Sequence, residues 1–375
     1  MRIAGLRWDA FAVPLTTPFR TAHGVVRRRE GLLIRLTTDD DVEGFGEASP
    51  LAEFDGATRA DCLAALEAAA PGIVGAPLAS LALCLDGLAG RPVPAALRCA
   101  LDTAALDALG RARGRPVAQL LADRAHANVA VNATIGGVRA EAAVEAARVL
   151  VDRGFGTIKL KVGVAGSIGE EIARVAAVHA AIGPAARLRL DANGSWSLDR
   201  ARRALDAFAD LAIELVEQPT SAADTGALAE LRRTSPIPIA ADEAVAGLEA
   251  ARRLVDAGAA DYLVVKPTMV GGLTVGRAIA DLALPAGVGV IVTSAFEVGV
   301  GIAAALHLAA TLPAEGPACG LATADALAAT LVRRLPTVDR GAMTVPTAPG
   351  LGVEVNDAEL AAYSSASREG GDATA

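Results

Sequence analysis

The chain has 375 residues, of which 53% are hydrophobic and 21% are charged, and its formal net charge at pH 7 is −8. A chain of this length and apolar content can bury a large core, and it fits one large domain with a smaller one beside it. The acidic balance excludes the basic stripe by which proteins hold nucleic-acid phosphates, so we expect no nucleic-acid partner.

Targeting and membrane signals are not found in the sequence. No apolar run reaches about 18 residues without a charge or turn residue, and the stretch MRIAGLRWDAF lacks the apolar core of a signal peptide. We therefore expect no membrane span and a cytoplasmic location. Four scattered cysteines without a Cys-x-x-Cys pair favour buried thiols over disulfides or a zinc site. They are Cys62, Cys84, Cys99 and Cys319.

The first hundred residues predict a small α+β unit. GLLIRLTTDDDVEGFGEASP (31–50) has the pattern of a strand, an acidic turn and a second strand. FDGATRADCLAALEAAAP (54–71) has the pattern of a capped helix, and a long helical stretch follows in PAALRCALDTAALDALGRARG (94–114).

Eight short runs rich in Val, Ile and Leu then alternate with segments of helical period. The runs are VAVNATIGG (129–137), TIKLKVG (157–163), RLRLDANG (187–194), AIELVEQP (212–219), PIAADEAV (238–245), YLVVKPTM (262–269), GVIVTSAFE (289–297) and ACGLAT (318–323). This alternation predicts an α/β fold, a (β/α)8-type barrel with an N-terminal α+β capping domain.

The predicted domains are the cap at residues 1–98, the catalytic barrel at 99–325 and a C-terminal segment at 326–375 that packs back on the cap and completes it. Within that segment AMTVPTAPGLGVEV (342–355) has the pattern of a strand pair returning to the N-terminal unit. We expect the tail SSASREGGDATA (364–375) to be disordered.

Four polar residues end consecutive runs at equivalent places. Asp191, Glu217, Asp242 and Lys266 are separated by 26, 25 and 24 residues, about one βα unit each. Any one of them alone could be a helix cap or turn residue, but together they predict side chains meeting at the carboxyl ends of barrel strands. Three convergent carboxylates require a cation or protons, and an all-oxygen ligand set favours Mg²⁺ or Mn²⁺ over zinc.

Two further lysines, Lys159 and Lys161, point to one face of the run TIKLKVG, because side chains alternate along a strand. A surface strand can carry such a pair. In a buried site each ammonium group would instead lower the pKa of the other. With Lys266 on the far side of the carboxylates, this arrangement suits abstraction of the weakly acidic proton next to a substrate carboxylate.

These motifs, in this order and spacing, resemble the enolase superfamily, and the lysines on both sides resemble its muconate-lactonizing subgroup. The resemblance extends over nearly the whole chain. It implies a small-molecule carboxylate substrate, Mg²⁺ ligands at Asp191, Glu217 and Asp242, and Lys161 as the base. It also implies that Lys266 is the opposite acid/base or a cationic stabiliser.

The resemblance implies supporting roles for three further residues. Lys159 would assist Lys161, and Asn193 and Glu243 would support the metal ligands. A mandelate-racemase type is disfavoured, because that branch needs a histidine at the end of the seventh strand, where this chain has Ser294 and Glu297. We expect core or surface roles for His179 and His307.

The cap loops TTPFRTAHGVVRRREGLLIRL and GFGEASPLAEFDGAT are similar to those of o-succinylbenzoate synthases, as are VTSAFEVGVGIAAALHLAA and CGLAT. This likeness implies a lyase of menaquinone biosynthesis that dehydrates 2-succinyl-6-hydroxy-2,4-cyclohexadiene-1-carboxylate. Substrate contacts are expected at Arg20, Ser294 and Glu297.

Three alternatives stay open from the sequence. The first two are isomerases of the same subgroup, an N-succinylamino acid racemase and a dipeptide epimerase. Dipeptide epimerases usually carry Asp-x-Asp at the eighth strand, where this chain reads CGLATAD with only Asp325 nearby. The third is a non-catalytic barrel that binds a ligand. A homo-oligomer is compatible with the sequence.

Overall fold

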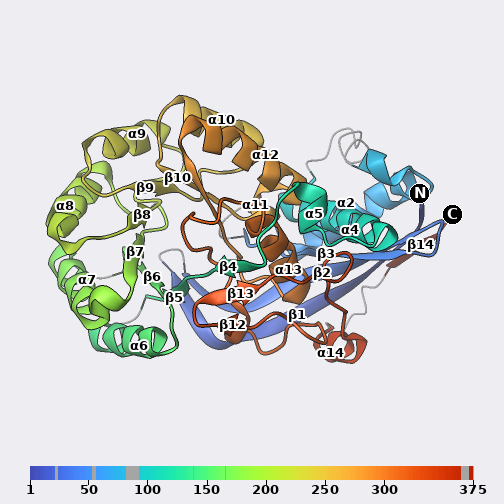
Figure 1. Cartoon of the computed structure of the whole chain (residues 1–375), viewed down its shortest axis with the longest axis horizontal. Helices are drawn as coiled ribbons and strands as arrows, with labels where there is room; N and C mark the ends of the chain where they lie inside the picture. Colours follow the sequence, from blue (N-terminus) through green and yellow to red (C-terminus); the bar gives the residue numbers. More distant parts are fainter. Residues whose placement is uncertain are drawn as a thin grey trace.

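The computed structural model describes residues 1–21, 24–52, 56–81, 93–137, 139–164, 166–364 and 371–374. A barrel of parallel strands lies beside a cap that is built on a long antiparallel ribbon (Figure 1). The two chain ends lie close together at the far end of that ribbon from the barrel (Figure 1).

The cap sheet consists of β1 (Ile3–Thr21), β2 (Gly24–Thr38) and β3 (Glu43–Ala48), paired antiparallel in chain order. The helices α2 (Arg59–Ile73) and α4 (Ala95–Arg113) share an apolar core with this sheet. The predicted strand, turn and strand and the two predicted helices are confirmed, whereas β1 was not predicted. Thr58 and Asp61 form a capping box at the start of α2, as its sequence pattern indicated.

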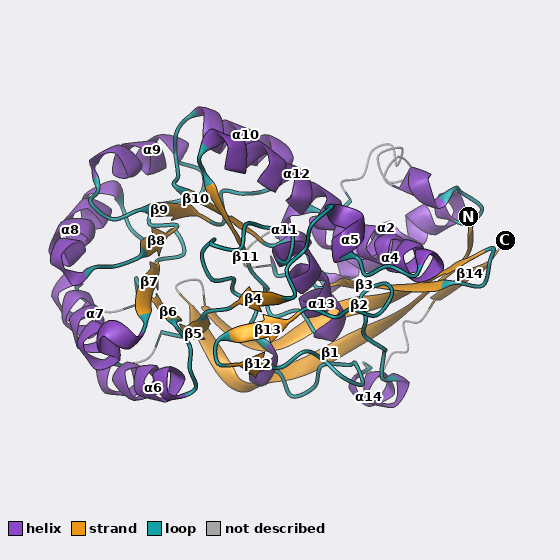
Figure 2. Cartoon of the chain, in the orientation of Figure 1, coloured by secondary structure: helices purple, strands orange, loops and turns teal. Residues whose placement is uncertain are grey.

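The barrel sheet contains seven parallel strands that neighbour one another in chain order. These are β5 (Ala133–Ile135), β6 (Thr157–Lys161), β7 (Arg187–Asp191), β8 (Leu215–Glu217), β9 (Ile239–Ala241), β10 (Tyr262–Val265) and β11 (Gly289–Val292). Helices form an outer layer around them (Figure 2). These helices are α6 (Ala140–Asp152), α7 (Ile168–Ile182), α8 (Leu198–Phe208), α9 (Thr225–Thr234), α10 (Leu248–Asp256), α12 (Leu273–Ala283) and α13 (Gly299–Ala309).

The outer helices differ in how much of their surface is buried, since α8 buries one face whereas α13 is buried almost throughout. In α8 the buried residues are Ala201, Ala204, Leu205 and Phe208, a spacing that places them on one helix face. The short helices α5 (Ala118–Leu121) and α11 (Pro267–Val270) lie in connecting segments.

The eighth predicted run closes the barrel without forming a regular strand. Residues 319 and 320 make single parallel bridges, Cys319 to Val131 and Gly320 to Thr293. Backbone hydrogen bonds of 2.8 to 3.0 Å join this segment to the chain on both sides, at Ala130, Asn132, Val292 and Ser294. The first run also differs from expectation, because it is divided between β4 (Asn128–Ala130) and β5.

Two expectations for the C-terminal segment are wrong. First, β13 (Ala342–Thr344) pairs with β12 (Val338–Asp339) and β4, so it does not return to the cap sheet. Second, residues 371–374 form β14 (Gly371–Thr374), which pairs with the edge strand β1. An edge strand offers unpaired backbone groups to an extended segment of any composition, which explains why a polar tail can pair there. The rest of the predicted disordered tail beyond Ser364 lies outside the described residues.

The predicted boundary between residues 98 and 99 falls inside α4, whose buried residues belong to the cap core. We therefore propose that the cap continues through α4. The helix α14 (Asp357–Tyr363) is tied to the cap by an ion pair between Asp357 and Arg35, with 3.0 Å between nitrogen and oxygen.

Among the described residues no helix is long and apolar enough to cross a bilayer. Cys62, Cys99 and Cys319 are buried free thiols, as expected, and Cys84 lies outside the described residues. His307 is fully buried, accepts a hydrogen bond from the Ala118 amide and lies 3.1 Å from the Leu351 carbonyl, which confirms a core role.

Candidate active site

The three predicted carboxylates meet at the carboxyl ends of neighbouring strands. Asp191 and Glu217 end β7 and β8, and Asp242 follows β9. One oxygen of each carboxylate lies within 4.8 Å of the others, and all three residues are buried. The structure therefore brings together the residues that the 26- and 25-residue spacings had placed at one end of the barrel.

The three predicted lysines flank this carboxylate triad from both sides. Lys159 and Lys161 lie on β6, and Lys266 follows β10, so the triad occupies the strands between them. The Lys161 ammonium group donates to Asp191 Oδ2 at 2.5 Å, and that of Lys266 donates to Asp242 Oδ2 at 2.5 Å. Lys159 lies deeper, with Nζ 2.9 and 3.1 Å from the two oxygens of Glu217.

Burial and mutual repulsion dominate the electrostatics of the triad. Burial, together with the Asp191 carboxylate, raises the pKa of Glu217 to about 8. Burial would also raise the pKa of Asp191, but the adjacent Lys161 and Lys159 ammonium groups outweigh burial and hold that pKa below its usual range. Burial also raises the pKa of Asp242, which Lys266 partly offsets.

The pKa of Lys159 differs from the expectation drawn from the sequence. The sequence suggested that neighbouring ammonium groups would lower each other's pKa. Burial does lower the pKa of Lys159, but the carboxylates of Glu217 and Asp191 outweigh burial and hold that pKa above its usual range. The expectation is wrong because the opposite charges on the next strands act on Lys159 as well as the like charge on its own strand.

These residues fit a hard divalent cation. The candidate ligands are all carboxylate oxygens, the donor class that Mg²⁺ and Mn²⁺ prefer. Burial and the Asp191 carboxylate both disfavour an ionised Glu217, and a cation beside the triad would oppose both effects. Among the described residues this triad is the only group of three or more carboxylate, histidine or cysteine side chains close enough to hold a metal.

Asn193 and Glu243 lie where support for the triad was predicted. The Asn193 amide donates to Glu243 Oε1 at 2.9 Å, and its carbonyl oxygen accepts from Lys161 Nζ at 2.8 Å. Gln218 was not predicted, although it stands in the quoted run AIELVEQP. Its Oε1 accepts the backbone amides of Asp242 and Ala244, at 2.9 and 3.2 Å, and so fixes the loop that carries the third carboxylate.

Beside the lysines lies a small cavity of about 60 Å³. Barrel residues and the tip of the cap ribbon line it together. They are Phe19, Val26, Leu51, Thr134, Lys159, Lys161, Lys266, Met269, Thr293, Ser294, Ala295, Phe296, Gly320 and Thr323. The apolar members were missed by sequence reasoning, because an apolar pocket wall has the same residue pattern as a core. A second hollow of about 380 Å³ shares Lys266 and Met269 and reaches the triad at Asp242.

The three predicted substrate contacts lie in different places. Ser294 lines the cavity. Glu297 does not line it, and its carboxylate accepts from the Ser294 hydroxyl and the Ala295 amide, both at 2.6 Å. Arg20 is exposed and is not among the lining residues, whereas its neighbour Phe19 is. A role for Arg20 in substrate binding stays a prediction.

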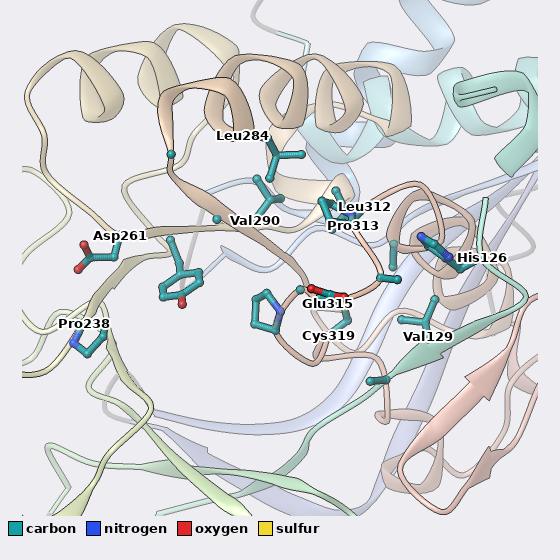
Figure 3. A pocket seen from close by; sticks show the side chains of 18 of the residues that line it. His126, Val129, Pro238, Asp261, Leu284, Val290, Leu312, Pro313, Glu315 and Cys319 are labelled. Atoms are coloured by element: carbon teal, nitrogen blue, oxygen red, sulfur yellow. The ribbon is translucent and has the colours of Figure 1, made fainter. Parts of the chain in front are cut away.

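A larger hollow, of about 570 Å³, lies at the opposite end of the barrel (Figure 3). Asp261 and Tyr262 line it at the start of β10, whereas Lys266 follows the other end of the same strand. Its titratable side chains, among them His126 and Glu315, form no metal-binding group with one another. The larger hollow therefore lies away from the lysines and the carboxylate triad, which gather at the other end of the barrel.

Comparisons with known proteins match both parts of the chain. Residues 7–122 match the family described as mandelate racemase / muconate lactonizing enzyme, N-terminal domain, and residues 141–359 match the family described as enolase C-terminal domain-like. The o-succinylbenzoate synthase of Thermobifida fusca (strain YX) is 38% identical over 84% of this chain and 79% of its own length.

Relatives with other activities are nearly as similar. The L-Ala-D/L-Glu epimerase of Bacillus subtilis (strain 168) is 31% identical over 83% of this chain and 86% of its own length. A crystal structure of the dipeptide epimerase from Enterococcus faecalis V583, complexed with Mg and the dipeptide L-Leu-L-Tyr, has a TM-score of 0.89 and 28% identity. It covers 94% of this chain and 100% of the epimerase. These matches confirm the resemblance inferred from the motifs.

Proposed function

The chain belongs to the enolase superfamily, whose reactions begin with Mg²⁺-dependent removal of a proton next to a carboxylate, and from this premise we propose that it is an o-succinylbenzoate synthase. Its substrate would be 2-succinyl-6-hydroxy-2,4-cyclohexadiene-1-carboxylate, which loses water to give o-succinylbenzoate. The relative from Thermobifida fusca supports this choice of reaction.

One observation about the cavity carries the proposal. Among its described lining residues there is no Asp or Glu, and the segment Gly320–Thr323 that closes the barrel contributes only neutral groups. Asp325, the nearest acid along the chain, is exposed and pairs with Arg153 at 2.7 Å. The ammonium group of a dipeptide would therefore enter this cavity without a counter-charge, whereas an uncharged ring would enter it at no such cost.

In this proposal Lys161 takes the proton from the carbon next to the substrate carboxylate. The same side chain returns that proton to the departing hydroxyl group on the same face, so the carbon–oxygen bond breaks and water leaves. Lys266, on the opposite side of the triad, stabilises the planar anion by its charge. Lys159, beneath them, keeps Glu217 and Asp191 in place through its ion pairs of 2.9 and 3.1 Å.

Asp191, Glu217 and Asp242 would hold Mg²⁺, and the ion would supply positive charge beside the substrate carboxylate. Asn193, Glu243 and Gln218 orient the residues that carry the ligands, as their hydrogen bonds indicate.

Racemisation of N-succinylamino acids is a second candidate. The placement of Lys161 and Lys266 on opposite sides of the triad favours it, because this reaction needs a proton taken from one face and returned to the other. Such a substrate carries no ammonium group next to its carboxylate, so a cavity whose described lining residues include no Asp or Glu accepts it too.

A panel of substrates tests the proposal. The purified protein, with Mg²⁺, should convert the cyclohexadiene carboxylate to o-succinylbenzoate, followed by absorbance, more efficiently than it racemises N-succinylamino acids. We expect little or no epimerisation of dipeptides. Failure to form o-succinylbenzoate together with ready epimerisation of dipeptides would reject the assignment. A Mg²⁺ titration by calorimetry without any detectable binding would point instead to a non-catalytic barrel.

A further inference from the structure

The start of α13 lacks a capping side chain of its own. The helix runs from Gly299 to Ala309, and the residue at its N-cap position, Val298, has an apolar side chain that makes no capping hydrogen bond. The first amides of any helix have no partner within the helix, and a buried helix start needs acceptors from elsewhere. The whole segment from Val298 to Val300 is buried, so water is a poor substitute.

A residue of the cap supplies the missing acceptor. Glu47, on β3, accepts from the Val298 amide through Oε1 and from the Gly301 amide through Oε2, each at 2.7 Å. The Ser49 hydroxyl donates to the same carboxylate at 2.5 Å. Glu47 is only 2% exposed. This is the geometry of a helix N-cap supplied from a distant part of the chain, 251 residues away.

The helix start that Glu47 holds is continuous with a wall of the reactive cavity. Residues 294–296 line that cavity immediately before Glu297 and Val298. Phe296 has a positive φ of 61°, a conformation that its surroundings must maintain. Its ring lies 4.9 Å from the ring of Phe19, between centroids, so the barrel loop and the cap ribbon meet over the cavity.

The cap side of the same joint also leads to the cavity. Ser49 follows Glu47 by two residues, and Leu51, two residues further, is a lining residue. Arg29 on β2 donates to the Ser49 carbonyl at 2.7 Å, which ties this loop to the cap sheet. Glu47 thus joins two segments that both line the cavity, one through Leu51 and the other through residues 294–296.

We propose that Glu47 is a positioning residue: by capping α13 from the cap domain, it fixes the 294–298 loop against the cap ribbon and so sets the shape of the substrate cavity. Glu47 touches none of the three lysines or the triad, so its effect should fall on substrate binding and leave proton transfer unchanged. The kinetic part of this inference depends on the proposed function, and the structural part does not.

The space around the carboxylate is closely filled. A side chain at Gly301 would meet Glu297 Cβ at 2.4 Å and Glu47 Oε2 at 3.0 Å, so only glycine leaves room for this contact. Burial, with the nearby Glu297 carboxylate, raises the pKa of Glu47 to about 7, although its hydrogen bonds from Ser49, Gly301 and Val298 oppose the change. Experiments at pH 8 therefore examine the ionised side chain.

Glu47→Gln tests the proposal, because an amide keeps the size of the side chain but turns an N–H group towards one of the helix amides. Loss of a helix cap is worth about 1.4 kcal/mol, so KM should rise about tenfold. The turnover number should change by less than about twofold, because the lysines and triad are untouched. Both values come from o-succinylbenzoate formation with saturating Mg²⁺ at pH 8.

Asp107→Asn is the matched control. Asp107 is also a fully buried cap carboxylate that accepts backbone amides, from Phe45 at 2.9 Å and Leu351 at 2.7 Å, but it lies away from the cavity lining. This variant should lose thermal stability and keep its KM. An unchanged KM in Glu47→Gln, or an equal rise in both variants, would overturn the proposal.

Hydrogen exchange of the full chain, followed by mass spectrometry without substrate, tests the structural part alone. Peptides that cover residues 294–303 should exchange faster in Glu47→Gln than in the wild type, and at the wild-type rate in Asp107→Asn. This result would stand even if the wild type makes no o-succinylbenzoate. Unchanged protection in Glu47→Gln would overturn the proposal.

Two further variants keep the test decisive if Glu47→Gln folds poorly. Glu47→Asp retains the charge but is one methylene too short to reach both amides. Its KM and its hydrogen exchange at residues 294–303 should therefore rise less than those of Glu47→Gln. Val298→Thr, added to Glu47→Gln, gives α13 a hydroxyl at its own N-cap and should restore protection. If the folded double variant regains no protection from hydrogen exchange at residues 294–303, Glu47 does not act by capping α13.

Discussion

Replacing Glu217 by Gln should stabilise the metal-free protein at high pH while weakening its response to Mg²⁺. Burial and the Asp191 carboxylate raise the pKa of Glu217 to about 8, from 4.5 in a solvated chain. Between these two pH values the unfolded state has lost the proton that the folded state still holds. Stability therefore falls as pH rises from about 4.5 to about 8, and the loss is complete above that window.

The size of the loss follows from the two pKa values. Each pKa unit is worth about 1.4 kcal/mol, so the raised pKa of Glu217 should cost the metal-free protein about 5 kcal/mol of stability at pH 9 and about 2 kcal/mol at pH 6, relative to low pH. A neutral Gln cannot ionise and avoids this cost. With an unfolding entropy of about 2.1 cal/mol/K per residue, 5 kcal/mol corresponds to a rise in melting temperature of roughly 6 °C.

The assay compares the melting temperatures of the wild type and Glu217→Gln in EDTA at pH 6 and pH 9. The same comparison is then made with saturating Mg²⁺ in place of EDTA. Mg²⁺ should raise the melting temperature of the wild type more than that of the variant, because the variant lacks one of three charged ligands. The control is Glu145→Gln, which removes the same charge from the exposed side of α6. It should leave both the melting temperature in EDTA and its increase with Mg²⁺ as in the wild type. The reasoning is refuted if Glu217→Gln melts no higher than the wild type in EDTA at pH 9, or if Mg²⁺ raises both equally.

Three other predictions concern the lysines and a buried histidine. Lys161→Ala should abolish exchange of the substrate α-proton with solvent deuterium, measured by NMR; exchange at the wild-type rate would mean that another group is the base. Lys266→Arg keeps a cation near Asp242 but cannot release its proton at neutral pH, so it should retain o-succinylbenzoate formation and lose any racemase activity. Loss of both activities would contradict the purely electrostatic role given to Lys266. Burial lowers the pKa of His307 to about 4, so protonation in the unfolded state should remove up to about 3 kcal/mol of stability as pH falls from 6.5 to 4. His307→Gln should flatten the melting temperature across that range, and an unchanged slope would contradict the argument.

The gathering of these charged side chains at one end of the barrel could be predicted from the sequence because its signal is local and periodic. Asp191, Glu217, Asp242 and Lys266 each end or follow a short apolar strand, and parallel strands separated by one helix bring their ends together in any barrel of this type. The start of α2 was readable for a similar reason, since the capping box of Thr58 and Asp61 lies within four residues.

Features that depend on contacts distant in sequence could not be predicted. The pairing of β14 with β1, and of β13 with β4, is made by backbone groups, which carry no residue pattern. The raised pKa of Lys159 depends on carboxylates from neighbouring strands, whose charges outweigh the lysine two residues away.

The cavity walls illustrate the same limit. Phe19, Leu51 and Phe296 look like core residues in the sequence, and only the docking of the cap ribbon on the barrel makes them the lining of a site. Glu47 looks like an ordinary strand residue until α13, 251 residues later, presents two amides to it. The sequence alone determined which charged groups gather at the strand ends, because strand period and spacing are local properties. The tertiary structure decided which apolar and charged groups surround them, because those neighbours come from separate parts of the chain.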